Sequence, residues 1–184
     1  MPVGALVLGH GAGGGITSPD LVGASNAARR ARFSVALVEQ PYRVAGRRSP
    51  PPATQLDAAW IAVVSQLRVG PLGGLPIVTG GRSAGARVAC RTAAATNSGA
   101  VLCLAFPVHP PGRPEKSRIA ELDAVNVPVL VVQGENDPFG TPPNHPNRKV
   151  VRIPGTHSLR SSATVAAAVS DWLAALVPEL GAVS

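Results

Sequence analysis

The hydrophobic positions of the chain are grouped into six short apolar runs separated by longer, mixed segments. Each run ends at or near a glycine, a proline or a polar residue, and in most of them apolar and polar residues do not alternate. Strands that are buried on both faces have this pattern, which is typical of parallel sheets. The sequence therefore predicts six strands, at Val3–Gly9, Phe33–Gln40, Leu75–Gly81, Gly99–Pro107, Val127–Gly134 and Arg148–Gly155.

Helical patterns fill the segments between these runs. Ser18-Pro19-Asp20 is a helix start signal, because serine can cap a helix, proline suits its first position and an acid suits its first turn. Another helix is expected to open at Ser83, and a short one is expected over Pro114–Leu122. Apolar stripes at helical spacing predict two more, through Leu56, Trp60, Val63, Val64 and Leu67 and through Val165, Val169, Trp172, Leu173 and Leu176. Strands thus alternate with helices, which predicts an α/β fold with helices on both faces of an open sheet.

Composition narrows the class of protein. With 184 residues, the chain is expected to form a single domain over residues 1–184. The net charge is +7, but the cations are scattered and aromatic residues make up only 3% of the chain. Nucleic-acid binding is therefore not expected, whereas an anionic substrate or acyl carrier stays open.

Cysteine usage and the absence of targeting signals indicate a cytoplasmic protein. Cys90 and Cys103 stand in apolar surroundings without a C-x-x-C pair, so they are expected to be core thiols in a reducing compartment and not a metal site. The N-terminus shows no signal-peptide pattern, and no apolar run reaches the length of a membrane span. We therefore expect no membrane association.

The segment Leu8–Gly15, LGHGAGGG, contains the spacing G-x-G-x-x-G that binds dinucleotides in some folds. It follows a predicted strand, and Glu39 ends the next strand, where a ribose-binding acid stands in those folds. Two features disagree with this interpretation. The helix start signal at Ser18 comes too late to present its N-terminus to a pyrophosphate, and His10 places a bulky ring inside the turn. A dinucleotide-dependent oxidoreductase is therefore the less favoured hypothesis.

A second motif, Gly81-Arg82-Ser83-Ala84-Gly85, has the pattern G-x-S-x-G. It stands between a predicted strand and a predicted helix, as a nucleophile elbow requires. Such a turn strains the backbone of the serine and needs small neighbours. Ser83 is therefore the candidate nucleophile.

A nucleophilic serine needs a base and an acid that orients the base. Asp137 follows the fifth predicted strand and His157 follows the sixth, so the order Ser83, Asp137, His157 is that of α/β-hydrolases. The carboxyl ends of parallel strands meet at one edge of the sheet, where sites are built. Glu135 is the alternative acid.

Backbone N–H groups near Ser83 are the candidates for an oxyanion hole. One is expected from Ala84, the residue after the nucleophile, and the other from Ala12 or Gly13 in the glycine loop.

Four other side chains are candidates to line a substrate pocket: His10, Arg82, His109 and Phe139. His109 lies in a proline-rich loop, and the sequence leaves open whether it lines the pocket or braces that loop.

Five stretches carry a resemblance that spans the chain: HGAGGG, GGRSAGAR, FPVHPPGRP, VQGENDPFG and PGTHSL. With them the chain resembles small α/β-hydrolases of the dienelactone-hydrolase-like group, and most of all the branch that includes testis-expressed protein 30 and the hydrolase-like domain of a chromatin-complex subunit. The resemblance implies Ser83, Asp137 and His157 as a catalytic triad. Ala86 and Thr156 depart from the usual pattern, which often has a glycine and an acid at these positions, but neither departure removes a catalytic group.

The resemblance also implies a three-layer fold with six mainly parallel strands in the order 2-1-3-4-5-6, lacking the first two strands of the full fold and a cap domain. The site is expected to be open and to take a small or exposed acyl substrate, with no cofactor and no metal. Some relatives act as binding or scaffold domains, so a non-catalytic binding module is the alternative to a serine esterase. Substrate identity and oligomeric state do not follow from the sequence.

Overall fold

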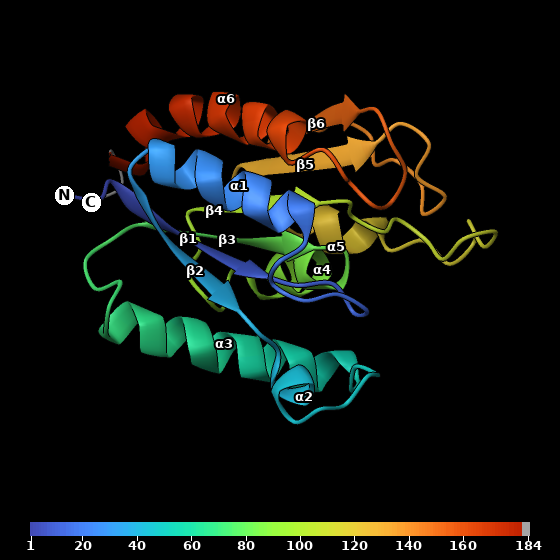
Figure 1. Cartoon of the computed structure of the whole chain (residues 1–184), viewed down its shortest axis with the longest axis horizontal. Coiled ribbons are helices and arrows are strands. Elements are labelled where there is room, and N and C mark those ends of the chain that lie inside the picture. Colours follow the sequence, from blue (N-terminus) through green and yellow to red (C-terminus); the bar gives the residue numbers. More distant parts are fainter. Residues whose placement is uncertain (182–184) are drawn as a thin grey trace.

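A six-stranded sheet forms the centre of the computed structural model, which describes residues 1–181 (Figure 1). The sheet order is β2-β1-β3-β4-β5-β6, and every neighbouring pair is parallel. The predicted strand order is thus confirmed, and the sheet is parallel throughout. The strands are β1 (Gly4–Gly9), β2 (Phe33–Val38), β3 (Ile77–Arg82), β4 (Ala100–Leu104), β5 (Val129–Gly134) and β6 (Arg148–Ile153).

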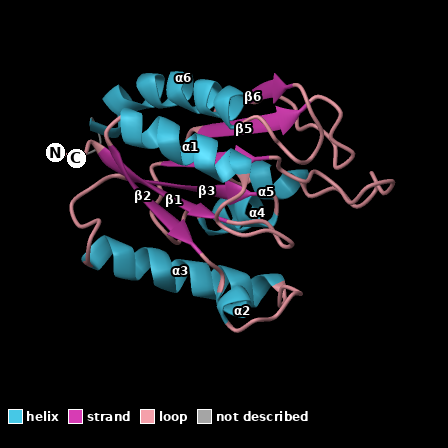
Figure 2. Ribbon diagram, in the orientation of Figure 1, coloured by secondary structure: helices cyan, strands magenta, loops and turns pink. Residues whose placement is uncertain are grey.

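Helices cover both faces of this sheet and make the three layers that Figure 2 shows. One layer contains α1 (Pro19–Arg30) and α6 (Ser162–Gly181), and the other contains α3 (Ala53–Val69), α4 (Ala84–Thr92) and α5 (Ile119–Asp123). In β1, Leu6 and Leu8 belong to the core beneath α1 and α6, whereas Ala5 and Val7 pack with Trp60 of α3. Because both of their faces are buried, the inner strands β1, β4 and β5 read as almost continuous apolar runs, whereas the edge strand β6 (RKVVRI) has exposed charged residues.

Two local predictions about helices differ from the structure. The helix expected over Pro114–Leu122 begins only at Ile119, because the preceding residues are exposed and charged and offer no apolar face to bury. A single turn, α2 (Pro41–Val44), was not predicted; it follows β2 and buries the side chain of Tyr42.

The expectation that no apolar segment reaches the length of a membrane span is wrong for helix α6. Over Ser162–Leu180 it is long and apolar enough to cross a bilayer by length and composition alone. The structure gives its apolar side another partner, since Val165, Val169 and Leu173 are fully buried in the core shared with α1 and the sheet. A long core helix passes the same compositional test as a membrane span.

Candidate active site

Ser83 lies in the sharp turn between β3 and α4. Its backbone has φ 51° and ψ −108°, a strained conformation for a residue with a side chain. The turn is held by the Ser83 N–H, which donates to the carbonyl of Leu104 at 2.9 Å. Gly81 and Gly85 leave room for it, since a Cβ on either would lie 2.6 Å from the carbonyl oxygen of Gly9. The strand–turn–helix context expected for G-x-S-x-G is therefore present.

A chain of hydrogen bonds joins Ser83 to His157 and Asp137, which lie in the loops after β6 and β5. His157 Nε2 lies 2.9 Å from Ser83 Oγ, and His157 Nδ1 lies 2.9 Å from Asp137 Oδ2. An ionised carboxylate can only accept, so Nδ1 carries the proton and Nε2 is free to accept from the serine hydroxyl. The Asp137 side chain is completely buried, whereas that of His157 is 15% exposed.

Asp137 has further partners that keep it fixed. Its Oδ1 accepts the backbone N–H of Phe139 at 2.8 Å, and its Oδ2 also accepts from Gln133 Nε2 at 2.7 Å. The ring of Phe139 stacks on His157, with the ring centroids 4.0 Å apart. Glu135, the alternative acid, is exposed, and its carboxylate makes no hydrogen bond within residues 1–181.

The glycine loop passes directly against the serine. A Cβ on Gly11 would lie 3.6 Å from the Cβ of Ser83 and 3.6 Å from the carbonyl oxygen of Arg82, so a glycine lets the loop pass close to the turn. The N–H groups of Ala12, Gly13 and Ala84 donate to no acceptor in the described part of the chain.

The side chains of His10 and Tyr42 hold the glycine loop in place through hydrogen bonds. Because the backbone N–H of Gln40 donates to His10 Nε2 at 3.0 Å, the proton of the ring sits on Nδ1, which lies 2.7 Å from the Gly11 carbonyl. The Tyr42 hydroxyl donates to the carbonyl of Ala12 at 3.0 Å. Burial raises the pKa of Tyr42, so the phenol remains a donor. His10 is buried, and its hydrogen bonds support the loop.

Arg82 ties the elbow to α1 and to the His157 loop. Its Nε lies 2.9 Å from Asp20 Oδ2, an ion-pair contact without hydrogen-bond geometry, and its Nη2 donates to the carbonyl of His157 at 3.3 Å. Asp20 is buried, and its other oxygen accepts from Ser18 Oγ and from the N–H of Leu21. Arg82 therefore has a supporting role in addition to its place at the edge of a hollow.

His109 is joined to the loop that carries the acid. Its backbone N–H donates to the carbonyl of Phe139 at 3.0 Å, and its Nδ1 lies 2.9 Å from the carbonyl of Pro110. A Cβ on Gly140 would lie 2.7 Å from its Nε2, so the ring packs closely on this turn. These contacts favour the role of a loop brace over that of a pocket residue.

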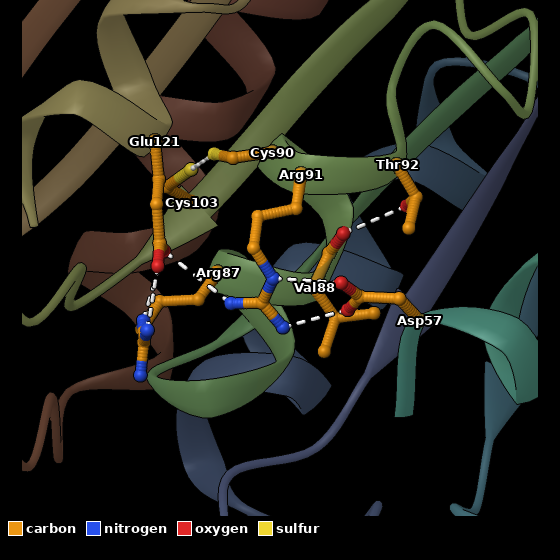
Figure 3. A network of polar contacts seen from close by, with 8 residues as sticks. All are labelled: Asp57, Arg87, Val88, Cys90, Arg91, Thr92, Cys103 and Glu121. Carbon is orange, nitrogen blue, oxygen red and sulfur yellow. Dashed lines mark hydrogen bonds and ion pairs between the residues drawn. The ribbon is translucent and has the colours of Figure 1, made fainter. Parts of the chain in front are cut away.

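Ion pairs on the outer face of α4 anchor the helix that follows Ser83 (Figure 3). Arg91 makes two hydrogen bonds to Asp57 of α3, at 2.8 Å and 2.6 Å, and Arg87 makes two to Glu121 of α5. Burial lowers the pKa of Arg91, but its hydrogen bonds with Asp57 and the two carboxylate charges outweigh this and raise the pKa. The network fixes α4, and with it the turn, against both neighbouring helices.

Cys90 and Cys103 lie beside this network, in the core. Both thiols are free and buried, with their sulfur atoms 3.5 Å apart (Figure 3). The prediction that they are core residues is confirmed. Among residues 1–181, no group of three or more histidines, cysteines and acids could hold a metal ion.

The geometry of the glycine loop does not fit a pyrophosphate. Helix α1 begins at Pro19, well after Gly14, and the carboxylate of Asp20 already accepts an N–H of its first turn. A dinucleotide phosphate would meet this negative charge. Glu39 lies exposed at the end of β2.

The surface beside the serine is hollowed but has no cap. A hollow of about 630 Å³ is lined by Gly13 and Gly14 of the glycine loop, by Arg82, and by Ser158 and Arg160 of the His157 loop, among others. Another hollow, of about 550 Å³, lies at the opposite edge of the sheet, where Pro76 and Pro128 precede their strands. It is remote from Ser83 and takes no part in the site.

Known proteins share this architecture. An α/β serine hydrolase without a lid from Xanthomonas campestris superposes with a TM-score of 0.73 at 21% identity, covering 94% of this chain and 83% of its own. Est1E from Butyrivibrio proteoclasticus gives a TM-score of 0.74 at 17% identity, covering 96% and 89%. Dienelactone hydrolase from Anabaena variabilis gives 0.70 at 18% identity, covering 95% and 87%.

Sequence comparison identifies the family. No curated protein matches the chain. The family model described as an alpha/beta hydrolase domain matches residues 2–162, which include both the serine turn and the loops that carry the acid and the histidine. The chain therefore belongs to the α/β-hydrolase domain family.

Proposed function

We propose that this protein is a serine hydrolase that cleaves an ester or related acyl bond through a covalent acyl-enzyme. The observation that carries the proposal is the continuous hydrogen-bond chain from Ser83 through His157 to the buried Asp137. In this order the three groups can activate the serine, move its proton and stabilise the imidazolium that results.

The mechanism follows from the donors and acceptors around Ser83. As its oxygen attacks the acyl carbonyl, His157 Nε2 takes the hydroxyl proton, and Asp137 holds Nδ1 and balances the new positive charge. The free N–H groups of Ala84 and of Ala12 or Gly13 donate to the oxyanion. Ala84 also begins α4, whose N-terminal dipole favours negative charge at this point. His157 then returns the proton to the leaving alcohol, and water releases the acyl group by the same steps.

The proposed substrate is a small ester with an anionic group. Est1E, which has the same fold, has been observed with ferulic acid bound, and this supports a small ester-type substrate for the present chain. In this chain, Arg82 and Arg160 line the hollow beside the serine, and the net charge of +7 draws anions toward the surface. The motif resemblance favours the dienelactone-hydrolase-like group as the nearest branch.

A fluorophosphonate probe tests the proposal, because it labels only a serine that is activated as a nucleophile. Wild-type protein should be labelled at Ser83 and should hydrolyse p-nitrophenyl acetate, and S83A should lose both properties. S65A, which removes an exposed hydroxyl from α3, is the matched control and should behave as wild type. Absence of labelling and hydrolysis in the folded wild type would favour the alternative, a binding module that kept the fold.

A further inference from the structure

Gln133 is a polar residue in the middle of the core. It is the penultimate residue of β5, its neighbours Val131 and Val132 are apolar, and it is fully buried. Its Nε2 lies 2.7 Å from Asp137 Oδ2, 2.9 Å from the carbonyl of Gly140 and 3.1 Å from the carbonyl of Phe106. The amide therefore touches the candidate catalytic acid and the two loops that flank it.

The orientation of this amide follows from its neighbours. The three atoms around Nε2 are a carboxylate oxygen and two carbonyl oxygens, which can only accept, so the amino end of Gln133 must face them. Its Oε1 has no hydrogen-bond partner within the described residues, which is costly at a buried position. The packing of β5 does not require this cost, because an apolar side chain of similar volume would avoid it. What the glutamine supplies is two amide hydrogens aimed at the acid and at the loops around it.

Asp137 depends on such donors because it is buried as a carboxylate. A buried charge is tolerated only when hydrogen bonds replace its lost hydration. Its donors are the Phe139 N–H, His157 Nδ1 and Gln133 Nε2. Of these three donors within residues 1–181, Gln133 comes from a strand, and the other two come from loops.

We propose that Gln133 is a positioning residue for the hydrolytic reaction, holding the Asp137 carboxyl group in line with His157 from the end of β5. The inference rests on the proposed function. Gln133 would act through Asp137 and would not touch the substrate. Its contacts to Phe106 and Gly140 also fix the walls of the loop that carries the acid, so the acid and its loop move as one unit.

Two substitutions separate this role from simple packing. Q133M keeps the volume but removes the donors. Since a hydrogen bond to a charged group contributes about 1.5–3 kcal/mol, kcat should fall about 10- to 150-fold while KM changes little. Q133E keeps the shape, and the carboxyl group that it introduces can donate only while it is protonated. Burial and the charge of Asp137 both favour the protonated form of this group.

The pH profile of Q133E is therefore the decisive measurement. The titratable group in contact with this amide is Asp137, whose Oδ2 also lies against His157 Nδ1, and His109 packs on Gly140 beyond it; none of them changes in the variant. Q133E should hydrolyse p-nitrophenyl acetate at low pH and lose kcat/KM at high pH, giving a basic limb that wild type lacks. Q66E introduces the same carboxyl group on the exposed face of α3 and should keep the wild-type profile.

The outcomes are distinguishable. If wild type itself neither hydrolyses esters nor reacts with the fluorophosphonate, the proposed function fails. If wild type is active but Q133M keeps its kcat and Q133E keeps the wild-type pH profile, the role of Gln133 is refuted while the proposed function stands. Should Q133M fail to fold, the pH profile of Q133E alone decides.

Discussion

Replacing Gly85 with alanine tests how closely the serine turn packs on the glycine loop. Gly85 lies in the first turn of α4, and helix propensity alone predicts that alanine stabilises this position by about 0.5–1 kcal/mol. The structure predicts the opposite sign. A Cβ at Gly85 would lie 2.6 Å from the carbonyl oxygen of Gly9, 2.8 Å from its carbonyl carbon and 2.8 Å from the carbonyl oxygen of His10. Overpacking costs about 1–3 kcal/mol, and a cost near the upper end is expected here because these neighbours are backbone atoms.

The net effect of G85A is therefore a loss of about 2 kcal/mol, from a cost of about 3 and a gain of about 1. For a chain of this length that lowers Tm by about 4–8 °C, which calorimetry or thermal circular dichroism can measure. Ester hydrolysis should also fall, since a shift of Ser83 by about 1 Å can cost about 100-fold in rate. G13A is the control, because a Cβ at Gly13 meets no atom within 4 Å and should leave Tm unchanged. A G85A protein with an equal or higher Tm would refute the close packing described above.

Three further predictions concern other contacts. R82M leaves the buried carboxylate of Asp20 unpaired and should lower the free energy of unfolding in urea by about 3 kcal/mol. Adding D20N to R82M should restore most of this loss. An unchanged urea midpoint for R82M would contradict the ion pair. F139A removes the ring stacked on His157 and should lower kcat/KM by up to about 10-fold, whereas equal rates would show that the stack does not matter. A hydrogen bond to the neighbouring thiol and burial raise the pKa of Cys103 well above its ordinary value, so native protein should resist iodoacetamide at pH 8 and unfolded protein should react. Because folding raises this pKa, the unfolded chain loses the thiol proton at a lower pH than the folded chain does. The free energy of unfolding should therefore be at its full value below the ordinary thiol pKa and fall as pH rises above it, which urea unfolding at several pH values can check.

The strands and layers could be predicted because the inner strands β1, β3, β4 and β5 are almost entirely buried, so their residues are mostly apolar without alternation, and such runs are visible in one dimension. The strand order was implied by the motif resemblance. The predicted start of α5 at Pro114 was wrong, because the helix-favouring residues before Ile119 have no apolar surface to pack against. The short helix α2 depends on the burial of Tyr42 beneath the glycine loop, a contact between segments that the sequence does not show.

The positions of Ser83, Asp137 and His157 could be predicted because each follows a strand, and parallel strands deliver their carboxyl ends to one edge. Gln133 and Asp20 were not recognised as part of the site. The signal for Gln133 was available, a polar residue inside an apolar strand, but its partners are the Asp137 carboxylate and two backbone carbonyls, whose positions depend on the fold. The bracing role of His10 likewise depends on the backbone of Gln40, thirty residues away in the sequence.

The placement of the acid and the histidine after the last two strands has a consequence for the timing of synthesis. A ribosome delivers β1, the glycine loop and the serine turn long before residue 157, and β6 can pair only with a β5 that is already in place. Every incomplete chain is therefore expected to lack hydrolytic activity, however well its first four strands have assembled. Under the proposed function, hydrolytic activity would then report that the sheet is complete, because it would appear only when β6 has docked.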